Sequence, residues 1–278
     1  MFGRTLRTFL VAGGCTVVLA LPNQARAQGN GNPPSNPAIG ESYNVELAGS
    51  LWMPSQSGII TSEQFGIAGS DIDFATDLGF KDKNFYDARV VLRAGRKHRF
   101  KFQYTPISYS ADSTLSRDVV FNGIKYTVDL PVQSAFDWKV FRVGYEYDFI
   151  YTDRGFLGFL IEARFTNMNA RLTSALNDEH TSAKAPLPSF GLVGRVYPIR
   201  NFSITAEASG FKLPDFSDDY EADYFDIDVY GTFNITDNLG VQGGYRRITT
   251  FLRVETDTGD LRFQGIWFGG VFRFFDKR

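Results

Sequence analysis

Apolar and polar residues alternate along the middle of the chain, between positions 141 and 165. In the first arm Phe141, Val143 and Tyr145 are separated by charged or small residues, and the pattern returns in the second arm. Successive side chains of a strand point to opposite faces, so each arm has one apolar and one charged face. The residues between the arms, 151–155, include Asp and Gly and predict a turn. We therefore predict a β-hairpin with two unlike faces.

The same alternation, interrupted by turn residues, predicts further strands on both sides of this hairpin. In the first of them Tyr43 is expected to share the apolar face with Val45 and Leu47. The tenth strand is expected to follow a turn at 256–259 and to end near Phe274. The other predicted strands span 43–53, 85–94, 100–104, 141–149, 157–165, 186–197, 202–211, 225–233 and 239–254.

The connections between these strands alternate in length. Tight turns are expected around Gly95, Asp153, Ile199 and Asp237, whereas the longer polar connections cover 53–84, 110–135, 173–185 and 212–222. Outer-membrane barrels have short periplasmic turns and long outer loops, and an even number of strands. We therefore predict an all-β fold, a transmembrane antiparallel up-and-down β-barrel of about ten strands, with eight or twelve as alternatives.

A soluble sandwich would bury the apolar face of each strand, whereas a membrane barrel turns that face to lipid and the charged face to the lumen. Connection lengths favour the barrel. The residues expected to face lipid include Phe141, Val143, Tyr145, Phe159, Ile161, Phe225 and Ile227.

Two positions break the alternation. Val140 and Phe141 are both apolar, and Arg246 and Arg247 are both charged. Each pair lies about one membrane span from its short turn, so we expect a β-bulge at the outer rim there. The strands are then expected to continue past the membrane as a collar.

The N-terminal residues, 1–27, have the features of an export signal. Two arginines precede an apolar run from Phe9 to Leu21, and Ala25-Arg26-Ala27 fits a cleavage site after Ala27. Residues 28–41 are rich in Gly, Asn and Pro and are expected to be a flexible leader. The barrel is expected to span 42–278 as one domain.

Cysteine content and charge exclude several classes of function. The single cysteine, Cys15, lies in the predicted signal peptide, so thiol catalysis and Cys-based metal sites are excluded for the mature chain. Lipidation of Cys15 is disfavoured because the residues after it continue apolar. The formal charge of −2 gives no basic surface for nucleic acid. Aromatic residues make up 15% of the chain, which suits lipid-facing strands.

Several segments carry the hairpin pattern of a known class of protein. They read GYEYDF, TDRGFLG, GLVGRVYPI, ITDNLGVQGGYR and, at the end, GVFRFF. In these segments the chain resembles small Gram-negative outer-membrane β-barrel proteins, OmpA/OmpW-like in the loose sense. The resemblance implies location in the cell outer membrane and contact with its lipid and lipopolysaccharide. It also implies recognition of the C-terminal strand, at Phe274 or Phe275, by the barrel assembly machinery, and a monomeric barrel.

Charged residues on the predicted interior face are the candidate functional residues. A barrel of this size has a lumen close to being filled by side chains, and buried charges are tolerated when they pair. We therefore expect a charge-filled narrow interior and a structural or surface-binding role, with a narrow channel for ions or small polar solutes as the alternative. The predicted network contains Glu46, Arg89, Arg93, Arg142, Glu146, Asp148, Glu162, Arg164, Arg195, Glu207, Asp226 and Asp228.

Catalysis is the second alternative and rests on few residues. His98 is expected in a short turn, and His180 follows two acids in a long outer loop. A rim histidine can serve a hydrolase of lipid or peptide, but no pattern places a nucleophile beside it. We predict no catalytic residue, no cofactor and no metal site, although the acidic loop at 215–223 offers carboxylates. The pair Asn122-Gly123 predicts a loop hairpin with a type I′ turn.

Overall fold

The computed structural model describes residues 38, 40–63, 67–213 and 220–274. The predicted signal peptide, most of the predicted leader, residues 215–219 of the acidic loop and Phe275 lie outside the described residues. In the part of the chain that is described, no helix is long and apolar enough to cross a membrane.

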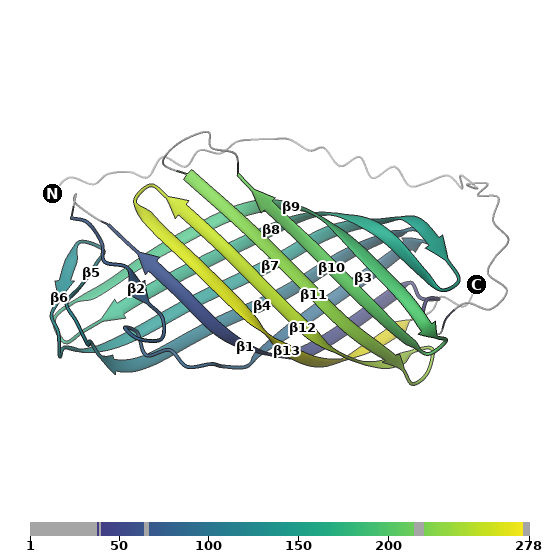
Figure 1. Ribbon diagram of the computed structural model, residues 1–278, viewed down its shortest axis with the longest axis horizontal. Helices are drawn as coiled ribbons and strands as arrows, with labels where there is room; N and C mark the ends of the chain where they lie inside the picture. Colours follow the sequence, from purple (N-terminus) through teal and green to yellow (C-terminus); the bar gives the residue numbers. More distant parts are fainter. Residues whose placement is uncertain (1–37, 39, 64–66, 214–219, 275–278) are drawn as a thin grey trace. The chain divides into compact units, whose positions relative to one another are not determined.

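Ten long strands form a closed antiparallel barrel, as the sequence predicted (Figure 1). Each long strand pairs with the next one along the chain, and β13 closes the barrel by pairing with β1. The short strand β2 (Ile72–Asp73) adds to the edge of β1. The barrel strands are β1 (Val45–Thr61), β3 (Phe85–Gly95), β4 (His98–Thr114), β7 (Pro131–Thr152), β8 (Gly155–Thr173), β9 (Asp178–Ile199), β10 (Phe202–Lys212), β11 (Tyr220–Asn234), β12 (Leu239–Val254) and β13 (Asp257–Phe274).

We call the end of the barrel with the tight connections the turn end, and the opposite end the loop end. Connections at the turn end are short between β3 and β4, β7 and β8, β9 and β10, and β11 and β12, as predicted. Strands β7 and β9 have 22 residues each, about twice the 9–11 residues that span a membrane. The strands therefore continue well past one membrane span.

The outward face changes character along each strand. On β7 and β8, nearer the turn end, it is apolar, with Phe141 44% and Phe165 53% exposed. Further toward the loop end the same face carries Asp137, Lys139 and Asn169. An apolar band that gives way to polar side chains is the exterior expected of a barrel that protrudes from a membrane.

The inward face changes in the opposite direction. Arg142 and Glu146 are buried in the lumen near the turn end, whereas Phe136, Trp138 and Val140 are buried further along β7. The lumen is thus charged where the exterior is apolar, and apolar where the exterior is polar.

This double change explains the two breaks in alternation, and the bulges predicted there are wrong. Val140 pairs with Thr166 and Phe141 with Phe165 in unbroken register, and Arg246 and Arg247 pair equally regularly with β11. At this level the lumen face changes from charged to apolar, and the outer face changes from apolar to polar. Val140 on the lumen face and Phe141 on the outer face are therefore both apolar, and Arg246 and Arg247 are likewise both charged. The register shifts that do occur lie near the turn end, at 93/95, 148/150 and 202/204.

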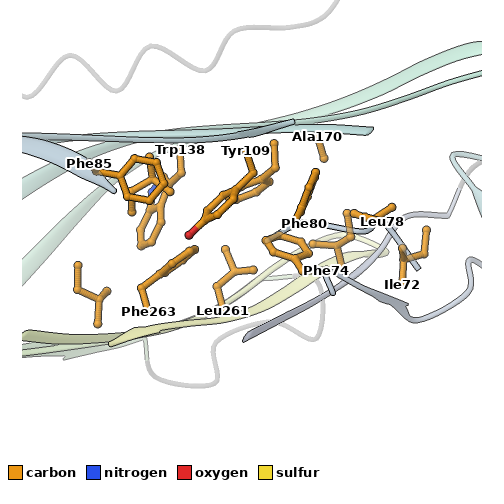
Figure 2. Packing of buried hydrophobic residues seen from close by; sticks show 14 of the residues in the cluster. Ile72, Phe74, Leu78, Phe80, Phe85, Tyr109, Trp138, Ala170, Leu261 and Phe263 are labelled. Atoms are coloured by element: carbon orange, nitrogen blue, oxygen red, sulfur yellow. The ribbon is translucent and has the colours of Figure 1, made fainter. Parts of the chain in front are cut away.

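The connection between β1 and β3 folds into the lumen and completes the apolar core of the loop-end half. Phe74 is fully buried and packs edge-on against Phe80, with ring centroids 5.3 Å apart, and against Phe136 of β7 at 4.8 Å. Phe80 in turn contacts Tyr109 of β4 at 5.6 Å (Figure 2). This connection was predicted to be a polar loop outside the barrel, which is wrong, because it folds inward and plugs the lumen.

A small hairpin covers the plug at the loop end. It consists of β5 (Val119–Phe121) and β6 (Ile124–Tyr126), and its turn residues Asn122 and Gly123 have φ values of 51° and 75°. Two positive φ values are what a type I′ turn requires, so the predicted hairpin is confirmed. The Tyr126 hydroxyl donates to the Leu172 carbonyl at 3.3 Å, which ties the hairpin to β8.

The connection between β8 and β9 is shorter than predicted. The two strands pair up to Thr173 and Asp178, so His180 lies within β9, opposite Arg171, rather than in a long loop. The register of β9 to β10 begins only at Phe190 and Gly210. Pro186 and Pro188 lie beyond that point, where β9 pairs with β8 but with no described residue of β10. Prolines are tolerated where one edge of a strand makes no ladder hydrogen bonds.

Candidate functional site: the charge network of the lumen

Buried charged side chains occupy the turn-end half of the lumen, and we call them the charge network. The twelve positions predicted from sequence all point inward, and most are less than 9% exposed. Six further charged residues that the predicted set lacked belong to the same network. They are Glu41, Asp87, Arg99, Lys101, Arg246 and Arg273.

Arg99 is the centre of the network next to the turn end. It is the second residue of β4, points inward, and is 2% exposed. Its guanidinium contacts Glu146 and Asp148, two inward residues of β7, and lies 3.3 Å from Glu41. Three carboxylates thus surround one cation that bulk water does not reach. Such a cation is tolerated because it is paired and hydrogen-bonded.

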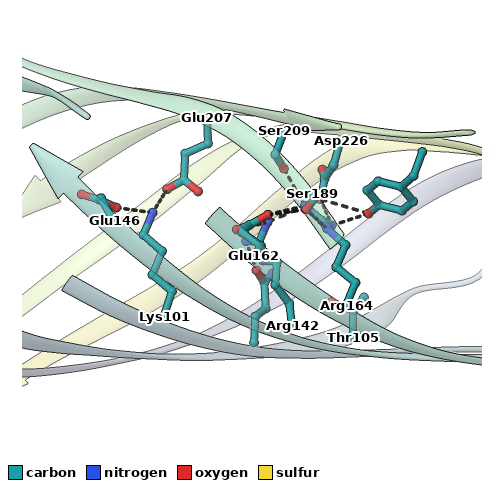
Figure 3. A network of polar contacts seen from close by, with 12 residues as sticks. Lys101, Thr105, Arg142, Glu146, Glu162, Arg164, Ser189, Glu207, Ser209 and Asp226 are labelled. Carbon is teal, nitrogen blue, oxygen red and sulfur yellow. Dashed lines mark hydrogen bonds and ion pairs between the residues drawn. The ribbon is translucent and has the colours of Figure 1, made fainter. Parts of the chain in front are cut away.

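Lys101, two residues further along β4, joins opposite walls of the barrel. Its Nζ lies 2.7 Å from Glu146 on the neighbouring strand β7 and 2.9 Å from Glu207 on β10 (Figure 3). Strands β4 and β10 are not neighbours in the sheet. The ammonium group therefore bridges the lumen rather than linking adjacent strands.

Asp226 of β11 is the centre of a second cluster, further from the turn end. Its carboxylate lies 2.8 Å from Arg246, 3.0 Å from Arg164 and 3.6 Å from Arg142. Glu162 adds a second carboxylate, 2.7 Å from Arg164 and 3.5 Å from Arg142. The cluster joins β7, β8, β11 and β12 across the lumen. Figure 3 shows its members Arg142, Glu162, Arg164 and Asp226.

Hydroxyl groups complete the hydrogen bonding of Arg164, which is 1% exposed. Its guanidinium donates to Ser189 at 3.1 Å, and to Ser209 and Tyr224 at 2.5 Å each. The Arg164 guanidinium also lies over the Tyr224 ring, 4.3 Å from its centroid. Neutral acceptors at these positions let one buried arginine use its donors without a further carboxylate.

Smaller pairs hold the remaining charged residues of the lumen. Arg273 donates to Glu46 at 2.7 Å across the closure between β13 and β1. Arg89 donates to Gln242 at 3.1 Å, and Asp228 accepts from the Trp267 indole at 2.8 Å. The other pairs are Arg93 with Glu41 at 3.6 Å and Arg195 with Glu41 at 3.0 Å.

The residues just before β1 belong to this site, although the sequence placed them elsewhere. Glu41, the last residue of the predicted leader, is 7% exposed and accepts hydrogen bonds from Arg195 and from the Tyr197 hydroxyl. Tyr43 was predicted to face outward, which is wrong. It is 5% exposed and lies under the guanidinium groups of Arg93 and Arg273.

The two histidines lie apart from each other and from the network. His98 is exposed at the turn end, with Nδ1 2.7 Å from the Tyr145 hydroxyl. His180 follows two acids. The Glu179 carboxylate accepts from the Asn122 amide at 2.7 Å, and the Asp178 carboxylate accepts from Arg171 at 2.7 Å and Thr173 at 2.9 Å. These hydrogen bonds lower the pKa of Asp178 to about 2, so the carboxylate serves a surface ion pair. The arrangement does not assemble a general base with its orienting acid.

Comparison with known proteins places the fold. No family model matches the chain, and no curated protein matches it. The outer membrane protease OmpT of Escherichia coli is similar in structure, with a TM-score of 0.53 and 11% identity over 83% of this chain and 97% of that one. The toluene transporter TodX of Pseudomonas putida gives a TM-score of 0.37 at 10% identity, covering 86% and 92% of the two chains. Neisserial surface protein A gives 0.34 at 11% identity, covering 84% and 99%.

Sequence identities of 10–11% carry information on the fold alone. Of these structures, only OmpT has a TM-score high enough to support a shared fold. This similarity agrees with the closed antiparallel barrel found here. The chain has the fold of a ten-stranded outer-membrane β-barrel with a buried charge network.

Proposed function

We propose that the protein is a closed, non-conducting barrel of the outer membrane with a structural or surface-binding role. One observation carries this proposal, the near-complete burial of the charges in the lumen. Arg99, Glu146, Asp148 and Arg164 are each at most 2% exposed although they are ionic side chains. A water-filled passage would hydrate such groups, so their burial supports a lumen without a continuous aqueous path.

The apolar plug of the loop-end half supports the same proposal. Ions crossing the barrel would have to pass both the charge network and the packed rings of Phe74, Phe80 and Phe136. An ion in such surroundings loses its hydration with no polar group to replace it. A narrow channel for ions or small polar solutes is the alternative, and it requires the plug to move aside.

Purified protein in planar lipid bilayers is expected to show no stable conductance at moderate voltage. The matched variant is Lys101→Met, which removes the cation that bridges Glu146 and Glu207 while keeping a long side chain. Loss of the bridge leaves two buried carboxylates close together, and we expect water to enter, with brief conducting events. A large and stable conductance of the unaltered protein would establish a channel instead.

The proposal includes export and assembly. We expect cleavage of the signal peptide after Ala27, contact of the apolar band with outer-membrane lipid and lipopolysaccharide, and recognition of the C-terminal strand by the assembly machinery. Phe272 and Phe274 of β13 are 43% and 46% exposed with their rings 4.7 Å apart, which suits an outward aromatic pair at that end. We expect a monomer, because each barrel strand already has a neighbour on both sides and no full-length edge is left for another chain.

Topology can be tested with single cysteines in the mature chain. Asp153→Cys and Asp237→Cys, at the turn end, are expected to be protected from an impermeant thiol reagent on intact cells. Asn177→Cys, between β8 and β9 at the loop end, is expected to be labelled. All three positions should label after the outer membrane is permeabilised, which controls for reactivity. Labelling of 153 together with protection of 177 would reverse the orientation.

A further inference from the structure

The inward side chains at the turn-end mouth of the barrel are buried, although they lie at the very ends of their strands. Asn234 is the last residue of β11 and is 2% exposed, and Arg273, one residue from the end of β13, is 1% exposed. Ser203, the second residue of β10, is also 1% exposed. Polar side chains at the end of a barrel meet water unless another part of the chain covers them. A cover is therefore present at this mouth.

The segment before β1 lies against the mouth. It comprises residues 38–43, of which 38 and 40–43 are described, and we call it the strap. Gly40 has a φ of 88°, a value that favours glycine. A Cβ added at Gly40 would lie 2.6 Å from the Arg273 guanidinium and 2.9 Å from the Asn234 amide oxygen. The strap backbone is thus in direct contact with the mouth residues of β11 and β13.

Glu41 fixes the strap to other strands of the wall. Its carboxylate lies 3.0 Å from Arg195 of β9 and 3.3 Å from Arg99 of β4. Arg93 of β3 lies 3.6 Å away, and the Tyr197 hydroxyl donates to the same carboxylate. Strand β9 is not a neighbour of β3 or β4 in the sheet. One carboxylate therefore holds the strap across the mouth, through charge-assisted contacts.

The wall itself holds these cations in place. The Arg195 guanidinium donates to the Thr205 hydroxyl at 2.8 Å, and the Arg99 guanidinium lies over the Phe156 ring, 4.1 Å from its centroid. Neither contact involves the strap. The strands therefore position a set of donors for a carboxylate, and Glu41, which belongs to no strand, occupies it.

We propose that the wall at the turn end carries a carboxylate-binding site, and that the chain closes its own lumen by placing Glu41 in it. The site consists of Arg93, Arg99, Arg195 and Tyr197. The inference names what closes one end of the lumen and rests on the closed barrel proposed above. Conductance tests the whole passage, including the apolar plug, whereas reagent access tests the turn end alone, so the two proposals can fail separately.

Release of the strap gives water access to the charge network. Tyr43 of the strap lines a small cavity together with Arg99, Lys101 and Glu207. Water that enters at the turn end reaches these charges first, while the plug still separates them from the loop end. Opening at the turn end is therefore expected to be local.

Two buried serines provide matched positions for a reporter thiol. Ser203 points inward at the turn end, and Ser134 points inward on β7 in the loop-end half. Both are at most 2% exposed, and neither hydroxyl has a hydrogen-bond partner among the described residues. Ser203→Cys and Ser134→Cys, each in the mature chain in nanodiscs, are expected to react slowly with methyl methanethiosulfonate, a small neutral reagent that reaches both ends. Mass spectrometry of the intact protein measures the rate.

Adding Glu41→Ala is expected to raise the labelling rate of Ser203→Cys about tenfold or more, because it leaves buried arginines unpaired and water enters. The rate of Ser134→Cys is expected to stay unchanged. The substitution removes a group with the shape of acetate, so sodium acetate is expected to restore slow labelling in a saturable way. Acetamide, which has the same shape without the charge, and sodium chloride at the same concentration are expected to have no such effect.

Gly40→Ala displaces the strap without changing any charge. The added methyl group meets Arg273, which hydrogen bonds to Glu46 and Asn234 hold in place, and the φ of Gly40 disfavours alanine. We expect faster labelling of Ser203→Cys here too, with no response to acetate.

Three results would overturn the proposal. The first is unchanged labelling of Ser203→Cys in both strap variants, and the second is equal rescue of Glu41→Ala by acetate and acetamide. The third is equal acceleration at 134 and 203, which would show that Glu41 stabilises the whole barrel rather than closing one end.

Discussion

Replacing Asp226 with alanine is expected to lower the free energy of unfolding of the barrel by about 3–5 kcal/mol. The carboxylate lies within 3.6 Å of three guanidinium groups, those of Arg142, Arg164 and Arg246, and all four side chains are buried. Without it, three cations remain in the lumen with one acceptor group fewer, and water cannot reach them without opening the barrel. A urea titration of the protein folded into lipid vesicles, followed by tryptophan fluorescence, measures the change.

Two controls separate charge pairing from other effects of this substitution. Asp226→Asn keeps the size and some of the hydrogen bonding, so its effect is expected to be smaller than that of alanine but in the same direction. Asp178→Ala removes the partner of Arg171 at the exposed loop end, and we expect no comparable loss, because solvent screens that pair. If Asp226→Ala unfolds at the same urea concentration as the unaltered protein, the network does not stabilise the barrel.

Placing a charge on the lipid-facing side is expected to have the second-largest effect. Val143 lies on the outward face of β7 within the apolar band, between Phe141 and Tyr145. Arginine near the middle of a bilayer costs about 2–4 kcal/mol on the lipid face of a barrel. Val143→Arg is therefore expected to reduce the folded fraction in vesicles, which is measured by the heat-dependent shift in electrophoretic mobility.

Asp137→Arg is the control for this prediction. Asp137 lies on the same strand and face as Val143, six residues closer to the loop end, where the outward side chains are polar. The new arginine should remain in water, so folding is expected to be almost unchanged. Equal effects at 137 and 143 would mean that the apolar band is not where the bilayer lies.

Alternation and turn residues were enough to predict the barrel, because both depend on neighbouring residues only. The ionic residues of the turn-end half were predicted for the same reason, since Arg142 and Glu146 alternate with apolar neighbours on one strand. Their partners across the lumen could not be predicted. The approach of Lys101 to Glu207 depends on how ten strands close, and no local pattern contains that information.

Other features were missed because one residue pattern can serve two environments. Phe136, Trp138 and Val140 alternate as a lipid-facing strand would, yet they face the lumen, since the face that is apolar changes along β7. Phe74 lies in a connection rich in polar residues, and only the tertiary structure brings it inside. His180 follows two acids, which favoured a loop, but pairing with β8 extends β9 through it.

Because the polar and apolar faces exchange along the strands, different interactions stabilise the two halves of the barrel. The turn-end half is held by lipid on the outside and by ion pairs within, so bilayer thickness and lipid composition act on it. The loop-end half shields its rings from water, as a soluble protein does, so unfolding it carries a positive heat-capacity change. Cooling and urea weaken that half in particular, because they weaken the burial of apolar surface. One continuous sheet thus combines two modes of stabilisation, and Val140 and Phe141 mark where one gives way to the other.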